Sequence, residues 1–191
     1  MNTTIIFAHP WHGSFNKAIM DTVISQLKAK KKPYEIIDLN KDEFNPVLKE
    51  ADLALFSKGD TSDDMVQKYQ EVLRNSDELV FIFPIWWFDM PAILKGFFDK
   101  VMLKDFAYKE STTGLKGLLT HVNKTTLLTT SEVPTWYMNF LSGNPIKGTL
   151  INRSLKGMGI KNVKWLNSDI TSTGKIERRH KYLNKVKRRF N

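Results

Sequence analysis

Three short stretches of the sequence carry side chains suited to holding a planar, phosphorylated molecule. Residues 9–16 offer imidazole, hydroxyl and amide donors just before a predicted helix. Residues 84–91 place three consecutive aromatic side chains between two prolines. Residues 129–137 supply hydroxyl groups followed by a tryptophan and a tyrosine. Because each stretch follows an apolar run of strand length, we expect all three at one edge of a sheet, where ligands of open α/β proteins bind.

The first stretch is neither a G-x-G-x-x-G fingerprint nor a Walker loop. It can still bind an anion, because the helix that follows presents free N–H groups and His9, Ser14 and Asn16 add donors. Taken alone, Ser14 or Asn16 could simply cap that helix, and His9 could be a core residue. Taken with the two other stretches, the pattern favours a phosphate-bearing ligand with a flat heteroaromatic ring, and a flavin is the simplest such ligand.

Composition restricts the class of protein. The chain has 191 residues, 41% of them hydrophobic and 26% charged, so we expect residues 1–191 to form a single domain. There is no cysteine, which excludes disulfides and thiolate chemistry and leaves any redox activity to a cofactor. No signal peptide is recognisable, so we expect a cytoplasmic protein. His121 and His180 lack partners at metal-ligand spacing, and no metal site is predicted.

The formal charge of +9 is concentrated near the C-terminus. Residues 175–191 contain eight basic residues and one acidic residue. The rest of the chain carries 21 basic and 19 acidic groups, which argues against a nucleic acid partner. The basic face of this predicted amphipathic helix is expected to be solvated. Weak contact with an anionic membrane surface or a partner protein is the alternative.

Apolar runs and helical periodicities alternate along the chain and predict an α/β fold. We expect strands at 3–8, 34–39, 78–83, 124–130 and 162–166. We expect helices at 14–32, after residue 60, from 91 to 101, at 146–156 and at 174–190, with short helical turns within 40–60. Residues 103–123 should form a loop or lid, and residues 131–145 a loop. The inward side chains predicted for the last helix are Ile176, His180, Leu183, Val186 and Phe190. The favoured topology is a doubly wound, five-stranded parallel sheet with helices on both faces.

Several blocks resemble the flavodoxin-like NAD(P)H:quinone oxidoreductases. The most specific is Phe83-Pro-Ile-Trp-Trp-Phe-x-x-Pro-Ala-Ile-Leu-Lys-Gly-Phe-Phe-Asp-Lys-Val101, and the others are Ala8-His-Pro, Ser14-Phe-Asn-x-Ala18, Phe106-Ala-Tyr108 and Thr129-Thr130. The resemblance implies a flavodoxin-like fold, a tightly bound flavin and a homodimer whose subunits complete each other's active sites. It also implies ping-pong hydride transfer from NAD(P)H to a quinone or similar aromatic acceptor.

Carried over position by position, the resemblance assigns the flavin phosphate and ribityl chain to His9, Ser14, Phe15, Asn16 and Ala18. It assigns the isoalloxazine to Pro84, Ile85, Trp86, Trp87 and Phe88, and the third flavin-binding loop to Thr129 and Thr130. Tyr137 falls at the spacing of the catalytic tyrosine that assists hydride transfer. The separation of His9 from Ser14 matches relatives that use FAD, so FAD is the predicted cofactor and FMN the alternative.

The chain departs from the family pattern at two places. Ser131 and Glu132 stand where the family has two glycines, and Gly143 stands where it has a histidine that pairs with the tyrosine. Without that histidine, either Tyr137 assists hydride transfer alone, or another donor such as His12 takes the place of the histidine, or the protein prefers a different electron acceptor. These departures keep a second hypothesis open: a flavin-binding regulatory subunit of a membrane transporter on the same fold. A one-electron flavodoxin carrier is less favoured, because its acidic character and hydroxyl-rich phosphate loop are missing.

Overall fold

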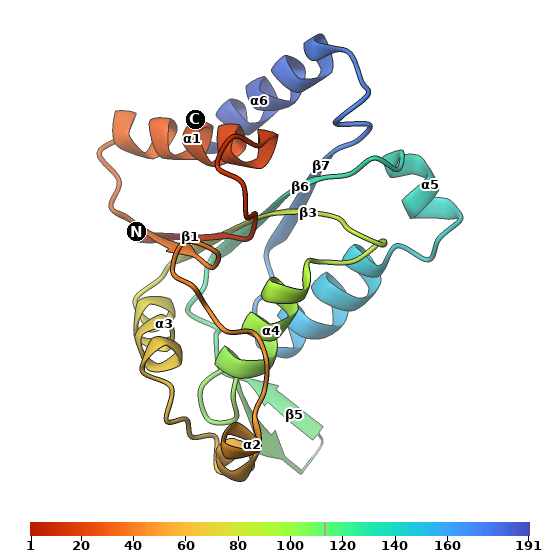
Figure 1. Cartoon of the computed structure of the whole chain (residues 1–191). Helices are drawn as coiled ribbons and strands as arrows, with labels where there is room; N and C mark the ends of the chain where they lie inside the picture. The colour runs from red at the N-terminus through yellow and green to blue at the C-terminus, as the bar shows by residue number, and fades with distance from the viewer. Residues whose placement is uncertain (113) are drawn as a thin grey trace.

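The structure, a computed structural model, describes residues 1–112 and 114–191. The central sheet is built from strands β1 (Thr3–Phe7), β2 (Tyr34–Asp38), β3 (Glu78–Pro84), β6 (Lys124–Thr130) and β7 (Val163–Ser168). All four pairings are parallel, and the strand order is β2-β1-β3-β6-β7 (Figure 1). This is the flavodoxin-like order, and it confirms the predicted doubly wound, five-stranded sheet.

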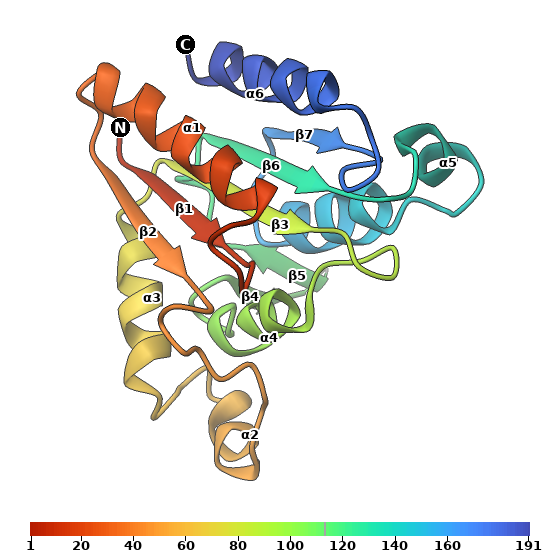
Figure 2. The same ribbon diagram turned by 45° about the horizontal axis from the view of Figure 1, so that its top comes forward.

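Helices cover both faces of the sheet. Helices α1 (Phe15–Ala29) and α6 (Ile176–Phe190) lie on one face, while α3 (Asp64–Arg74), α4 (Ala92–Val101) and the π-helix η1 (Ile146–Leu155) lie on the other (Figure 2). In the described part of the chain, no helix combines the length and the apolar character needed to cross a membrane.

Successive side chains of β3 point to opposite faces of the sheet and contribute to two hydrophobic cores, one on each face. Val80 and Ile82 face α1 and α6, whereas Leu79, Phe81 and Phe83 face α3, α4 and η1. A strand covered on both faces must be apolar at every position, so its sequence is a continuous hydrophobic run. Placing this strand at the centre of the sheet fixes where residues 84–91 leave it.

Two segments predicted as loops contain regular structure. Within residues 103–123, β4 (Tyr108–Ser111) and β5 (Gly114–Gly117) pair as a small antiparallel sheet, and Thr113 lies outside the described residues. Within residues 131–145, α5 (Thr135–Phe140) forms a short helix. Elements of four to six residues are too short to show a hydrophobic period, so the sequence pattern did not reveal them.

The inward face predicted for the last helix was partly wrong. Ile176 is 62% exposed and His180 is exposed, whereas the buried residues are Tyr182, Val186 and Phe190. Ile176 lies in the exposed first turn of α6, and the buried stripe of this helix starts with the Tyr182 ring. The Tyr182 hydroxyl donates to the Leu166 carbonyl oxygen at 2.8 Å, which lets an amphipathic side chain occupy a core position.

A buried lysine anchors the excursion that contains α2 (Glu50–Phe56). The Lys100 ammonium donates to Asp63 Oδ2 at 2.7 Å and to the Asn45 carbonyl oxygen at 3.2 Å. It also lies 5.6 Å from the centre of the Phe44 ring. These contacts tie both ends of residues 45–63 to α4, a role that the sequence pattern did not reveal because lysine is rarely buried.

Candidate active site

The three stretches singled out by the sequence meet at the carboxyl edge of the sheet, as predicted. They surround a cavity of about 350 Å³ next to the point where the strand order reverses between β1 and β3. We call this the sheet-edge cavity; its lining residues are His9, Trp11, Gly13, Ser14, Phe15, Asn16, Pro84, Ile85, Trp86, Thr130, Ser131, Glu132, Thr171, Ser172 and Arg179. Its size and position are those of ligand sites in open α/β sheets.

The first turn of α1 presents donors to this cavity. Ser14 caps the helix, because its Oγ accepts from the Lys17 N–H at 3.2 Å. Within the described residues, the N–H groups of Phe15 and Asn16 have no acceptor. Capping and anion binding are therefore compatible here, since the cap occupies one amide and leaves two others for a phosphate.

Asn16 is the best-buried polar side chain in the first loop, with 3% of its surface exposed. Its Nδ2 donates to Thr130 Oγ1 at 2.9 Å, which joins the first loop to the third. Its Oδ1 is buried and accepts no hydrogen bond within the described residues. An orphaned acceptor on a cavity wall is costly unless a ligand or water donates to it.

His9 is held as a neutral donor at the cavity mouth. Its Nδ1 accepts from the Trp11 N–H at 3.1 Å, which leaves the ring proton on Nε2. Burial lowers the pKa of His9 below its ordinary value, and the neighbouring His12 acts in the same direction. A neutral imidazole with Nε2–H free suits a hydrogen bond to a phosphate oxygen.

The aromatic loop divides into two parts. Trp86 lines the cavity, and its backbone exchanges two hydrogen bonds with Asp89, which close a tight turn over Trp87 and Phe88. Trp87 and Phe88 have φ of 51° and 68°, a conformation that strains bulky residues. Trp87 is 97% exposed and does not line the cavity. Phe88 also lies outside the lining, with its ring 6.3 Å from that of Tyr137.

The remaining predicted residues are placed around the cavity rather than on its wall. Thr129 is fully buried and donates to Asn167 Oδ1 at 2.7 Å, and Ala18 lies one turn into α1. Tyr137 is 38% exposed on α5. His12 also stays outside the lining: its Nε2 is 2.8 Å from the buried carboxylate of Asp38, which gives no support to a substitution for the missing histidine.

Sequence reasoning missed the fourth wall of the cavity. Glu132 Oε1 accepts from the Ser172 N–H at 2.8 Å, and Arg179 Nε donates to the Thr171 carbonyl oxygen at 2.9 Å. The Arg179 guanidinium also lies 6.0 Å from the centre of the Phe15 ring. No sequence motif predicts that these residues line the cavity. The one available indication was that Arg179 precedes Tyr182 by about one helical turn, which places it at the edge of the buried stripe of α6.

Comparison with known proteins agrees with this geometry. The profile of the flavodoxin-like fold family Flavodoxin_2 matches residues 1–190. A protein of Haemophilus influenzae named uncharacterized NAD(P)H oxidoreductase is 33% identical over 168 residues, which cover 86% of this chain and 82% of that protein. The rat NAD(P)H dehydrogenase [quinone] 1 is 33% identical over 158 residues, which cover 73% of this chain but 56% of the rat protein.

Solved structures show the same fold over the whole chain. Smu.1420 from Streptococcus mutans UA159 has a TM-score of 0.85 at 33% identity, with 100% of this chain and 98% of that chain covered. The NAD(P)H:quinone oxidoreductase from Methanothermobacter marburgensis has a TM-score of 0.89 at 24% identity, covering 100% and 97% of the two chains. On the sequence match and the site's place in the fold, this chain belongs to the flavodoxin-like NAD(P)H:quinone oxidoreductase family, and it is an oxidoreductase.

Proposed function

We propose that the protein is a flavin-dependent NAD(P)H oxidoreductase that passes a hydride by a ping-pong mechanism to quinones or similar aromatic acceptors. One observation carries the proposal: free helix amides, a buried unpaired acceptor and an indole wall line the same cavity. Without cysteine, the chain itself has no two-electron centre. A bound flavin would supply that chemistry.

The residues at the α1 end of the cavity fit a phosphate and its ribityl chain. The N–H groups of Phe15 and Asn16 would bind phosphate oxygens at the positive end of the helix dipole. His9 would add a neutral N–H donor, and the side chain of Arg179 a positive charge. The unpaired Oδ1 of Asn16 would accept a hydrogen bond from a ligand hydroxyl group.

The residues at the β3 end fit a flat ring. Pro84 and Ile85 form an apolar floor, and Trp86 stands beside it, with its ring 6.2 Å from that of His9. An apolar wall excludes water from a site of hydride transfer and thereby protects the transferred electrons. Tyr137, behind Phe88, is the residue that we assign to assisting hydride transfer. Loss of the family's histidine partner should slow the reaction without abolishing it.

An exposed aromatic surface favours the homodimer that the family resemblance implies. Large apolar side chains stand near the cavity, in the loop after β3 and at α5, and all of them are substantially exposed: Trp86, Trp87, Tyr137, Phe140 and Leu141. An exposed group of this kind is typical of a protein interface. We propose that a second copy of the chain covers it and completes the acceptor site.

FAD remains the flavin that we expect, and FMN is the alternative. An azoreductase of Bacillus anthracis with the same fold, described as FMN-dependent and solved with FMN, has a TM-score of 0.82 at 18% identity, with 100% of this chain and 98% of that chain covered. Denaturing the purified protein and identifying the released flavin by mass decides between them. No flavin released, and none taken up on titration with either compound, would contradict the proposal as a whole.

The kinetic form of the proposal is tested by initial rates. With NAD(P)H varied at several fixed concentrations of a soluble quinone, double-reciprocal plots should be parallel lines. Intersecting lines would show that both substrates bind together and would overturn the ping-pong mechanism. The relatives' names do not favour the transporter-subunit hypothesis; a protein that holds flavin but is not reduced by NAD(P)H would revive it.

A further inference from the structure

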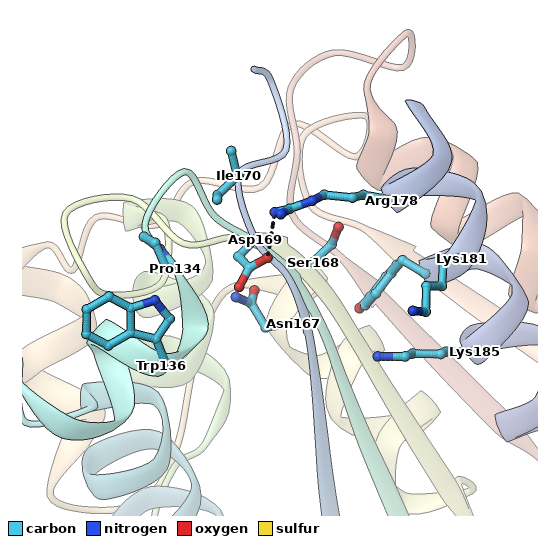
Figure 3. Close-up of a pocket in the computed structure, with 10 residues that line it drawn as sticks. Pro134, Trp136, Asn167, Ser168, Asp169, Ile170, Arg178, Lys181 and Lys185 are labelled. Atoms are coloured by element: carbon cyan, nitrogen blue, oxygen red, sulfur yellow. Dashed lines mark ion pairs between the residues drawn. The ribbon is translucent and has the colours of Figure 1, made fainter. Parts of the chain in front are cut away.

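A second cavity lies at the carboxyl end of β7 (Figure 3), beside a loop whose later residues line the sheet-edge cavity. Its volume is about 390 Å³, and it is bounded by the carboxyl end of β7, by α6 and by Trp136 of α5. Ser168–Ile170 line this cavity, whereas the next two residues, Thr171 and Ser172, line the sheet-edge cavity. The loop therefore separates two distinct hollows, and the proposed flavin site does not account for the second.

Three cations of α6 face this second cavity. Arg178, Lys181 and Lys185 follow the i, i+3, i+7 spacing of one helical face, and Figure 3 shows Arg178 and Lys185 reaching from α6 toward β7. The adjacent Arg179 points to the other hollow. We call the lined space the α6 basic pocket, after Arg178, Lys181 and Lys185.

The positive charge of this pocket is not neutralised within the described chain. Lys181 and Lys185 have no hydrogen bond or ion pair to any described residue, and the one carboxylate in the pocket is that of Asp169. Its Oδ2 already accepts from both the N–H and the Oγ1 of Thr135, at 2.8 and 2.9 Å. Its Oδ1 is 3.9 Å from the Arg178 guanidinium, a weak contact.

The opposite end of the pocket is aromatic. Trp136 is 59% exposed there, and two polar side chains of the wall already have partners: Asn167 donates to Ser131 and Thr135, and Tyr182 donates to Leu166. The pocket thus offers cations at one end and an indole at the other. Guanidinium and ammonium groups bind phosphate, and an indole face binds a planar or apolar group.

We propose that the α6 basic pocket binds a ligand with a phosphate monoester or diphosphate, whose apolar or planar part lies on Trp136. The phosphate contacts Arg178, Lys181 and Lys185. A soluble phosphorylated molecule and a phospholipid headgroup share this chemistry. The inference is independent of the proposed hydride transfer, because its residues line a different cavity and its test measures binding.

The test is calorimetric titration of the full-length protein with pyrophosphate and with ADP, in the presence of saturating flavin so that the sheet-edge cavity does not contribute. Lys181→Gln/Lys185→Gln should weaken binding by about 100-fold, as expected for two lost contacts to a charged group. The matched control Lys161→Gln/Lys187→Gln removes the same charge at exposed positions outside the pocket and should leave affinity unchanged. Trp136→Ala should weaken ADP binding and leave pyrophosphate binding unchanged.

A second arm identifies the source of the phosphate. Sedimentation with phosphatidylcholine vesicles, with and without phosphatidic acid, is measured for the same variants. Pocket-dependent binding of pyrophosphate or ADP supports a soluble ligand, and pocket-dependent binding of phosphatidic acid vesicles alone supports a lipid headgroup. Absence of binding in both arms, or equal loss in the control pair, overturns the proposal, because general basic charge would then explain any attraction.

Discussion

Asn16 Nδ2 donates to Thr130 Oγ1 across 2.9 Å, although the two residues are 114 positions apart in the sequence. The bond holds the start of α1 against the end of β6 and orients the Asn16 amide. The other amide atom, Oδ1, is buried and accepts no hydrogen bond from the residues that the structure describes. The Asn16 amide therefore has two roles. Its Nδ2 joins the first stretch to the third, and its Oδ1 is left for a ligand in the sheet-edge cavity.

Replacing Asn16 should weaken flavin binding more than it weakens the fold. Asn16→Leu removes both amide atoms, and we expect flavin affinity to fall by roughly tenfold or more from the lost ligand contact. Flavin titration measures it, with a parallel measurement of the melting temperature. Thr130→Ser keeps the oxygen that Asn16 binds and serves as the control. If Asn16→Leu lowers only the melting temperature, the unpaired oxygen serves the fold rather than a ligand.

Tyr137→Phe tests the tyrosine without changing its packing on Phe88. We expect reduction of the bound flavin by NAD(P)H to slow by roughly 100-fold, the lower end of the contribution of a positioned proton donor. Stopped-flow absorbance measures the rate, and flavin affinity should stay the same. Tyr108→Phe, on a half-buried tyrosine of β4, should change neither quantity. Equal reduction rates in wild type and Tyr137→Phe would remove Tyr137 from the mechanism.

The environment of His9 predicts a loss of stability in mild acid. Burial lowers its pKa in the folded protein below the ordinary 6.5, so the unfolded chain takes up a proton first as the pH falls. His9 therefore contributes fully to the free energy of unfolding at pH values above its ordinary pKa of 6.5. This contribution is lost as the pH falls from 6.5 toward the lower pKa that His9 has in the folded protein. Urea unfolding of wild type and His9→Gln through this range should show a shallower pH dependence in the variant. If the free energy of unfolding depends on pH in the same way in wild type and His9→Gln, the lowered pKa of His9 would be contradicted.

The buried Lys100 should make Asp63 important for stability. Burial acts to raise the pKa of the Asp63 carboxyl, but the hydrogen bond and charge of Lys100, with the N–H groups of α3, lower it overall. Asp63→Ala removes the nearer carboxylate and leaves the buried ammonium with only Asp52 Oδ2, at 4.0 Å, as a charged partner, and it should cost about 3 kcal/mol of unfolding free energy. Asp99→Ala breaks the exposed pair of Asp99 with Lys95 and should cost at most about 0.5 kcal/mol. Similar losses in both variants would show that Lys100 finds another partner.

The aromatic surface beside the cavity predicts the oligomeric state. Phe140 is 80% exposed, and Phe140→Glu should convert the proposed homodimer to a monomer in sedimentation velocity measurements. Leu115, 67% exposed on β5, lies away from this surface, so Leu115→Glu should remain dimeric. A wild-type monomer, or a dimer that survives Phe140→Glu, would place the interface elsewhere.

Much of the fold was predictable because long, covered elements leave a clear pattern. The run from Leu79 to Phe83 is apolar at every position since both faces of β3 are packed, and alternation with helices leaves few topologies. The same signal is missing from β4, β5 and α5, which are short and largely exposed. Ile176 was placed inward by its residue type, although it lies in the exposed first turn of α6.

The candidate site likewise contains some residues that the sequence predicts and others that it does not. Ser14 and Trp86 were predictable because local sequence fixes a helix cap and a loop after a buried strand. Arg179 and the Glu132–Ser172 contact were not, because they depend on the segment after β7 and the start of α6 coming together with the first and third stretches in the folded chain. Trp87 was predicted to contact the ligand but does not line the cavity. Its neighbour Trp86 does, whereas a tight turn with positive φ directs Trp87 to the surface.

The central claim is that this cavity holds a flavin that accepts a hydride from NAD(P)H. Its most direct test is an anaerobic titration of the flavin-loaded protein, first with NAD(P)H and then with a soluble quinone, followed by the absorbance of the flavin. We expect one equivalent of NAD(P)H to bleach the flavin and one equivalent of quinone to restore its absorbance. A flavin that stays oxidised in excess NADH and excess NADPH, or a protein that binds none, would contradict it.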